Sequence, residues 1–214
     1  MKSPANKLWV FDFDGTLVDS ESAIRKCYVA VTRKLAPSLV ARAQSILIGP
    51  TLDESSREIL GETHLERLEE FKKEFQYEYD SNTVFETPTY PKVEQVLKFL
   101  LDRGDKMSIA TNKRSGPTHA LLKHFQWESY FEFVACIDEF TNQKNKTEMV
   151  AHMLTKHAQF RTSYFVGDTL SDGIAAKENK LRFIKAQYGY GNNQDWREIP
   201  IYKTIAQVDE LLVV

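Results

Sequence analysis

The fold of this chain is decided by Val10-Phe11-Asp12-Phe13-Asp14-Gly15-Thr16-Leu17-Val18-Asp19. The run from Leu8 to Phe13 is rich in aromatic and branched residues, which favour a buried strand. Gly15 predicts the end of that strand, because glycine adopts backbone angles that other residues avoid. Asp12 and Asp14 are two residues apart, so in an ideal strand their carboxylates would share one face and meet at one site.

Two ionised acids buried side by side are costly unless a positive charge compensates them. A hard divalent cation does so, and Mg2+ is typically held by one or two carboxylates together with phosphate and water. For a bare Asp-x-Asp-Gly pattern, the simpler interpretation is an exposed edge strand that ends in a turn. Features elsewhere in the chain favour the metal site.

Composition bounds the class of protein. The 214 residues allow one large domain, or one domain with a modest insertion, and 42% hydrophobic residues suit a globular protein with a sizeable core. The net charge of -2 gives no basic field that would attract nucleic acid or a membrane. No apolar run is long enough to cross a bilayer, and no hydrophobic signal segment precedes the first strand. We therefore expect a cytoplasmic protein.

The segment from Ser20 to about Asp80 has helical periodicity throughout, although it directly follows a strand. We expect helices over Leu39–Ile48 and His64–Tyr79, and another that Thr51-Leu52-Asp53-Glu54 opens as a capping box. This pattern predicts an all-helical domain at residues 19–85, inserted into a core domain made of residues 1–18 and 86–214.

Past Pro88 the pattern alternates between strands and helices, which predicts a parallel sheet with helices on both faces. The expected fold class is thus α/β, a Rossmann-like parallel sheet core with an inserted all-helical domain. The expected strands after the first are Lys106–Ala110, Phe131–Ile137, Ser163–Gly167, Leu181–Ala186 and Tyr202–Ile205, and Val208–Leu212 is expected to be a final helix.

Several predicted strands end in polar residues, and the carboxyl ends of parallel strands meet at one edge, where such sheets bind ligands. That edge would combine carboxylates, a hydroxyl, an amide and an ammonium group. This mixture suits a phosphoryl group, which needs cations against its charge, donors for its oxygens and a nucleophile in line. The contributing residues are Asp12, Asp14, Thr111, Asn112, Lys146, Asp168 and Asp172.

In these residues the chain resembles the haloacid dehalogenase superfamily, most closely its phosphoglycolate phosphatase-like hydrolases with a helical cap. Asp12-Phe13-Asp14-Gly15-Thr16-Leu17 matches the first motif of the family and Thr111-Asn112 matches the second. Lys146 matches the third motif, and Gly167-Asp168 with Asp172 matches the fourth. The resemblance extends from Lys7 to about Gly191.

The resemblance implies a role for each of these residues. Asp12 would be the nucleophile that forms an aspartyl-phosphate, and Asp14 the general acid and then the base. Mg2+ would be held by Asp12, the backbone carbonyl of Asp14 and Asp168, and Asp172 would orient that shell or reach the metal through water. Lys146 would neutralise the nucleophile and the phosphate. Phosphate contacts would come from Thr111 and from backbone amides of Asn112 and Gly15. Thr16, Lys113 and Thr51 are further substrate-binding candidates, although the position of Lys113 also fits a lysine that meets only solvent.

Two assignments stay open at this stage. Lys144 and Lys146 flank Asn145, and we prefer Lys146 because Thr147-Glu148 opens a helix after it, as in relatives with a Lys-x-Glu pattern. Thr51 lies in a segment that resembles the cap loop reaching over the active site in this family. The same segment also fits a turn that only connects two helices.

The expected function is a Mg2+-dependent phosphatase that acts on a small soluble phosphomonoester, as a monomer or homodimer, without nucleic acid or membrane partners. Dehalogenases of the superfamily lack the second aspartate, so Asp14 favours phosphoryl transfer. A sugar-phosphate mutase of the same superfamily would also keep Asp14 and is the enzymatic alternative. A non-catalytic metabolite-binding protein would be expected to have lost Asp12, Asp14 or Lys146, and this chain has all three.

Overall fold

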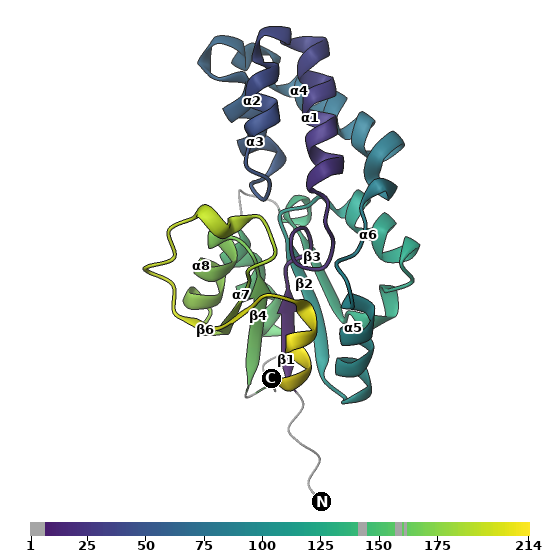
Figure 1. Ribbon diagram of the computed structural model, residues 1–214, viewed down its shortest axis with the longest axis vertical. Coiled ribbons are helices and arrows are strands. Elements are labelled where there is room, and N and C mark those ends of the chain that lie inside the picture. The colour runs from purple at the N-terminus through teal and green to yellow at the C-terminus, as the bar shows by residue number, and fades with distance from the viewer. Residues whose placement is uncertain (1–6, 141–144, 157–159, 161) are drawn as a thin grey trace, which may run out of the picture. The chain divides into compact units, whose positions relative to one another are not determined.

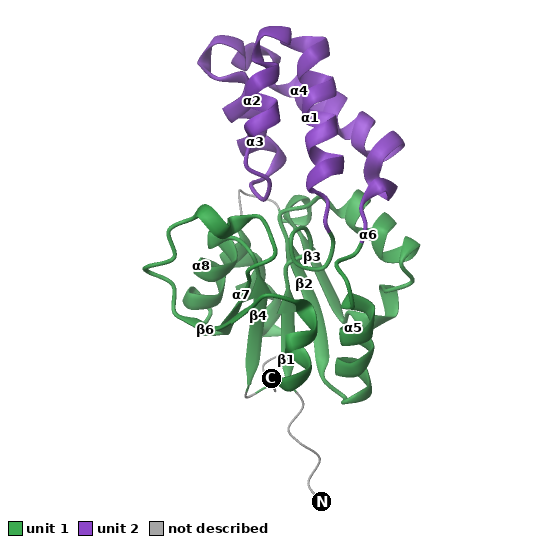
Figure 2. Ribbon diagram, in the orientation of Figure 1, with its two compact units in different colours: residues 1–18, 89–214 green, residues 19–88 purple. Residues whose placement is uncertain are grey.

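The structure is a computed structural model, and it describes residues 7–140, 145–156, 160 and 162–214. The chain divides into two compact units, Met1–Val18 with Thr89–Val214, and Asp19–Pro88 (Figure 2). The first unit contains a six-stranded sheet and the second is helical (Figure 1).

All neighbouring strands of the sheet are parallel, in the order β3-β2-β1-β4-β5-β6. The α/β class and the parallel sheet predicted from the sequence are therefore confirmed. β1, fully buried, lies at the centre between β2 and β4. The strands are β1 (Leu8–Phe11), β2 (Lys106–Thr111), β3 (Phe133–Cys136), β4 (Ser163–Gly167), β5 (Arg182–Ala186) and β6 (Ile201–Ile205).

Helices cover both faces of the sheet. The connections that contain α5 and α6 run from β1 towards β3, whereas those that contain α7 and α8 run back towards β5. Because such crossovers are right-handed, the two pairs of helices lie on opposite faces (Figure 1). The helices of this unit are α5 (Val93–Asp102), α6 (Ser115–His124), α7 (Lys146–Thr155) and α8 (Leu170–Glu178).

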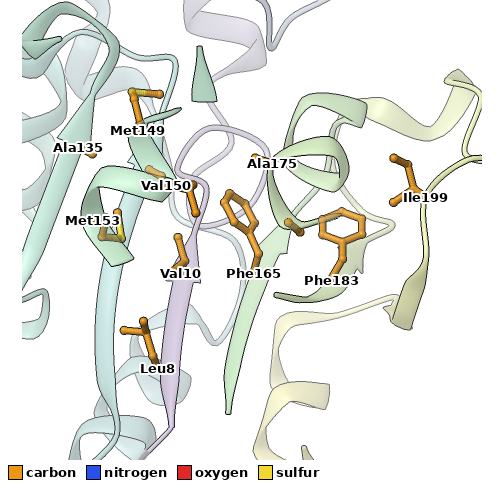
Figure 3. Packing of buried hydrophobic residues seen from close by; sticks show 12 residues of the cluster. Leu8, Val10, Ala135, Met149, Val150, Met153, Phe165, Ala175, Phe183 and Ile199 are labelled. Carbon is orange, nitrogen blue, oxygen red and sulfur yellow. The ribbon is translucent and has the colours of Figure 1, made fainter. Parts of the chain in front are cut away.

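The core on the α7 and α8 face is apolar. Val10 of β1 and Phe165 of β4 pack there against Met149 and Val150 of α7 and Ala175 of α8 (Figure 3). Burying each of the larger side chains, those of valine, phenylalanine and methionine, contributes roughly 1.5–3 kcal/mol. This packing prevents the strands from sliding along their axes relative to the helices. It therefore also fixes the position of the loops that follow the strands.

The helical unit contains α1 (Glu21–Leu35), α2 (Val40–Ser45), α3 (Leu52–Leu60) and α4 (Leu68–Glu78). Its core is aromatic: the ring of Tyr28 on α1 packs against that of Phe75 on α4, with 4.4 Å between the ring centroids. Short 3-10 segments cover Pro37–Leu39, Glu62–Arg67 and Val84–Glu86, and a single π turn covers Tyr79–Thr83.

Several predicted elements differ from the structure, among them the strand predicted over Phe131–Ile137, which is limited to Phe133–Cys136. The first strand ends at Phe11 rather than Phe13, so Asp12 and Asp14 lie in the turn that follows it rather than on one strand face. The helix predicted over Leu39–Ile48 is limited to Val40–Ser45. The helix predicted from His64 begins at Leu68, because His64 has a non-helical backbone. The final helix is a 3-10 segment, Val208–Val213.

Candidate active site

Three neighbouring strands at the centre of the sheet, β2, β1 and β4, end next to residues with polar side chains. β2 ends at Thr111, β1 is followed by Asp12, and β4 is followed by Asp168. Since these strands are parallel neighbours, the side chains converge at one edge. The loops at this edge form the candidate active site.

Asp12 is fixed by two donors. Its Oδ1 accepts a hydrogen bond of 2.7 Å from the backbone N–H of Phe13 and lies 3.0 Å from the ammonium nitrogen of Lys146. Lys146 is the first residue of α7, and its ammonium also lies 2.6 Å from Oδ1 of Asp172. The side chains of Lys146 and Asp12 are only 3% and 7% exposed. One ammonium group therefore bridges two buried carboxylates.

Asp12, Asp168 and Asp172 form a three-carboxylate group. One oxygen atom from each lies within 4.8 Å of the others, and all three residues are buried. Asp172 sits in the first turn of α8, where its Oδ2 accepts from the backbone N–H and the hydroxyl of Thr169, at 2.8 and 2.7 Å. The helix cap thus fixes the direction in which the Asp172 carboxylate points.

The charges of this group are strongly coupled. Burial, followed by repulsion from Asp172, raises the pKa of Asp12 from 3.8 to about 7. Burial, followed by repulsion from Asp172 and Asp12, raises the pKa of Asp168 well above its usual value. Burial alone would lower the pKa of Lys146, but Asp12 and Asp172 raise it. Burial is the larger cause for both aspartates, and the excess of negative charge adds to it, since three carboxylates share one ammonium group.

A magnesium ion fits this arrangement. Carboxylate oxygens are the ligands that hard divalent cations prefer, and a cation would relieve the repulsion that raises the pKa of Asp12. The side chain of Asp14 is not part of the three-carboxylate group. Its backbone carbonyl, which the resemblance assigns to the metal, follows Asp12 in the same turn.

The carboxylate of Asp14 has a different partner. Its two oxygens lie 3.0 and 3.3 Å from the ammonium nitrogen of Lys113, in the loop after β2. The backbone N–H of Lys113 donates to the hydroxyl oxygen of Thr111, at 3.1 Å. Lys113, predicted as a substrate contact, is therefore an ion-pair partner of Asp14.

The turn after Asp14 is held against Asp168. The hydroxyl of Thr16 donates to Oδ1 of Asp168, at 3.2 Å. Gly15 has a φ of +79°, and a Cβ atom at this position would collide with the Asp168 carboxylate. Glycine is thus required here both for its backbone angle and for the close approach of Asp168.

A loop that the sequence analysis missed supports the site, between Gln187 and Gly191 after β5. The backbone N–H of Tyr190 donates to Oδ2 of Asp168 at 2.7 Å, and the hydroxyl of Tyr188 donates to the backbone oxygen of Thr16 at 2.9 Å. A Cβ atom on Gly189 would collide with Asp168 and with the carbonyl oxygen of Gly15. The sequence Gly189-Tyr190-Gly191, shortly after a predicted strand, was the signal that could have indicated this loop.

Three predicted residues remain outside the contacts above. Asn112 directly follows Thr111 at the end of β2. Thr51 belongs to the helical unit, where its hydroxyl accepts from the backbone N–H of Glu54 in a capping box at the start of α3. That box was predicted, and it is confirmed. Lys144, the alternative to Lys146, lies outside the described residues.

Comparison with known proteins identifies relatives of similar length. The chain is 30% identical, over 85% of its length and 81% of the relative's, to a Dickeya dadantii protein named "Probable phosphatase IndB". It is 26% identical, over 90% of its length and 88% of the relative's, to a phosphoglycolate phosphatase from Psychrobacter arcticus.

A solved structure shares the fold. It is a haloacid dehalogenase-like family hydrolase from Streptococcus pneumoniae, with a TM-score of 0.80 and 20% sequence identity, covering 100% of this chain and 99% of that one. Among the described residues of the present chain, no helix combines the length and apolar character that a membrane span requires.

The family model of haloacid dehalogenase-like hydrolases matches residues 9–186. This range begins in β1 and ends with β5, so it includes the three-carboxylate group, Lys146, Thr111 and the turn around Asp14. The chain belongs to the haloacid dehalogenase-like hydrolase family.

Proposed function

We propose that this protein is a Mg2+-dependent phosphatase that hydrolyses a small phosphomonoester through an aspartyl-phosphate intermediate. One observation carries the proposal: two aspartates of a single turn have different surroundings. Asp12 belongs to the three-carboxylate group and contacts Lys146, whereas Asp14 lies outside that group and contacts Lys113. Different environments suit two carboxylates for different roles in one reaction.

Asp12 is the proposed nucleophile. In the first step one of its carboxylate oxygens forms a bond to phosphorus while the bond from phosphorus to the leaving oxygen breaks. Oδ1 of Asp12 is already held by Phe13 N–H and by Lys146, which orients the carboxylate before the phosphate arrives. Such orientation reduces the entropy that the step would otherwise lose.

Asp14 is the proposed general acid and base. Its proton passes to the leaving oxygen, which keeps the electron pair of the broken bond and departs as an alcohol. In the second step the ionised carboxylate removes a proton from the water that attacks phosphorus and releases Asp12. Its place outside the three-carboxylate group suits a proton carrier better than a metal ligand.

Asp12, Asp168 and the backbone carbonyl of Asp14 are the proposed magnesium ligands, with Asp172 orienting them. A bound magnesium ion would supply positive charge that stabilises the charge of the phosphoryl group. Lys146, between Asp12 and Asp172, would add a second positive charge on the same side. The Thr111 hydroxyl, whose oxygen accepts from Lys113 N–H, would donate its own proton to a phosphoryl oxygen.

The proposed substrates are small phosphate esters of the phosphoglycolate, nucleotide or sugar phosphate type. Similarity to a protein named phosphoglycolate phosphatase supports the first of these. Substrate selection by the cap predicted at residues 19–85 stays a prediction, as do a cytoplasmic location and a monomeric or dimeric state.

The test is release of phosphate from para-nitrophenyl phosphate and then from a panel of metabolite phosphates. We expect release that requires Mg2+, stops with chelator and returns when Mg2+ is restored. Asp12→Asn should stay folded and inactive. Folded wild-type protein that releases no phosphate from any ester of the panel at saturating Mg2+ would contradict the proposal.

A further inference from the structure

Lys113 and Asp14 form a nearly enclosed ion pair. The ammonium nitrogen of Lys113 lies 3.0 Å from Oδ1 and 3.3 Å from Oδ2 of Asp14, and the side chains are 5% and 13% exposed. An ammonium group this well shielded from water needs an anion or a hydrogen-bond acceptor nearby. Asp14 supplies one, and the ion pair restricts the directions in which its carboxyl group can point.

The two buried lysines of the site serve different carboxylates. Lys146 contacts Asp12 and Asp172, within the three-carboxylate group, whereas Lys113 contacts Asp14, outside it. Without a positive charge of its own, the Asp14 side chain would be free to turn towards the nearest cation. Lys113 thus provides a reason why the carboxylate of Asp14 stays apart from the three-carboxylate group.

The backbone of Lys113 fixes a second group of the site. Its N–H donates to the hydroxyl oxygen of Thr111, at 3.1 Å. A hydroxyl oxygen that accepts in this way can still donate its own proton to another acceptor. A single residue of the loop after β2 therefore orients both the proposed phosphate donor and the proposed general acid.

We propose that Lys113 is a positioning residue that directs the carboxyl group of Asp14 towards the leaving oxygen, rather than a contact for the substrate itself. The inference rests on the proposed function, since it assigns a partner to the general acid of that reaction. A direct substrate contact would require the ammonium to bind an anionic group of the leaving alcohol.

The two possible roles of Lys113, positioning Asp14 and binding the substrate, predict different losses of activity for different leaving groups. An aryl oxygen leaves as a stable anion and needs little help from Asp14, whereas an alkyl oxygen needs the proton as its bond to phosphorus breaks. A misdirected Asp14 should therefore slow alkyl esters far more than aryl esters. A lost contact to a substrate carboxylate should instead slow only esters that carry one.

The experiment compares Lys113→Met and Lys113→Gln with wild-type protein on para-nitrophenyl phosphate, glycerol phosphate and phosphoglycolate. We measure kcat/KM, which reports the first step of the reaction. For both alkyl esters we expect a loss on the order of 10²-fold, and for the aryl ester a loss about tenfold smaller. The matched control is Lys123→Met, which replaces an exposed lysine on α6 and should leave all three values unchanged.

A double-mutant cycle tests whether Lys113 acts through Asp14. In an Asp14→Asn background, Lys113→Met should cause no further loss of kcat/KM for alkyl esters, because the group that it positions is absent. A thermal shift on adding Mg2+ that matches the wild-type value shows that the variants are folded and that their three-carboxylate group is intact.

Equal losses on all three esters, a loss confined to phosphoglycolate, or additive losses in the cycle would overturn the inference. None of these results affects the proposed function, because each requires wild-type activity. Wild-type protein inactive on all three esters would instead contradict the proposed function, and the inference with it.

Discussion

The ammonium nitrogen of Lys146 lies 3.0 Å from Oδ1 of Asp12, and the two side chains are 3% and 7% exposed. Asp12 follows the central strand of the sheet and Lys146 begins a helix on one of its faces. The pair therefore depends on the assembled fold, and it places a positive charge beside the proposed nucleophile.

Replacing Lys146 by methionine should impair both activity and stability. The variant leaves Asp12 and Asp172 buried without their shared counter-charge, for which we expect a loss of about 3–5 kcal/mol in the free energy of unfolding without metal. Turnover should fall on the order of 10²–10³-fold, because a charge that stabilises the phosphoryl group is lost.

Chemical denaturation and steady-state kinetics measure the two effects. The control is Lys177→Met, which replaces an exposed lysine on α8 and should change neither the free energy of unfolding nor the turnover. Adding Asp172→Asn to Lys146→Met should recover part of the stability but not the turnover. A Lys146→Met protein as stable as the control would contradict the assignment of a buried, bridging charge.

The metal-free protein should lose stability as pH rises from about 4 to about 7. Burial and the Asp172 charge raise the pKa of Asp12 from 3.8 to about 7, so the folded state holds a proton that the unfolded chain has already released in this range. The raised pKa of Asp168 acts in the same direction. Mg2+ binds the ionised carboxylates, so its stabilising effect should grow with pH.

Melting temperatures with and without Mg2+, at about pH 5 and about pH 8, check this dependence. Comparison with Asp12→Asn tests the contribution of the site, because the variant lacks both the Asp12 proton and the repulsion that raises the pKa of Asp168. The variant should show a flatter metal-free dependence. If the melting temperature of the metal-free variant falls with pH as steeply as that of metal-free wild-type protein, Asp12 does not titrate as described.

The loop after β5 should control magnesium affinity. Gly189→Ala places a methyl group against Asp168 and the carbonyl oxygen of Gly15, so it should displace a proposed ligand. Changes to groups that orient metal ligands typically cost about 10–100-fold in affinity, and we expect a loss in this range. Titration of Mg2+, followed by thermal shift, measures it.

Gly116→Ala is the matched control for this prediction. Gly116 lies on α6, and a Cβ atom at this position meets nothing within 4 Å. The control should keep the wild-type magnesium affinity. Gly189→Ala with unchanged affinity would show that the loop does not support the metal site.

Much of the fold could be predicted from the sequence because its signals are local. Alternation of apolar strands and helices predicted the parallel sheet, and β4 was predicted with its observed bounds, Ser163–Gly167. The polar residues Asp12, Thr111 and Asp168 were predicted to meet because they lie at strand ends. Element ends were less predictable: His64 interrupts the helical pattern through its backbone angles, which its side chain does not reveal.

The parts that were missed depend on contacts between distant segments. Tyr190 contributes a backbone N–H to Asp168, and every residue except proline carries that group. The ion pair between Lys113 and Asp14 was not predicted, since nothing in the sequence indicated that the Lys113 side chain would reach Asp14. Only the assembled sheet brings the loops after β1, β2, β4 and β5 to one edge.

The central claim is that Asp12 becomes phosphorylated, and trapping of the intermediate tests it most directly. Asp14→Asn removes the base of the second step, while para-nitrophenyl phosphate needs little acid in the first, so phosphorylated protein should accumulate with Mg2+. Acid quenching and peptide mass mapping should find one phosphoryl group per chain, and none when Asp12→Asn is added. A phosphoryl group that persists in the double variant, or phosphate release without any labelled protein, would contradict the account.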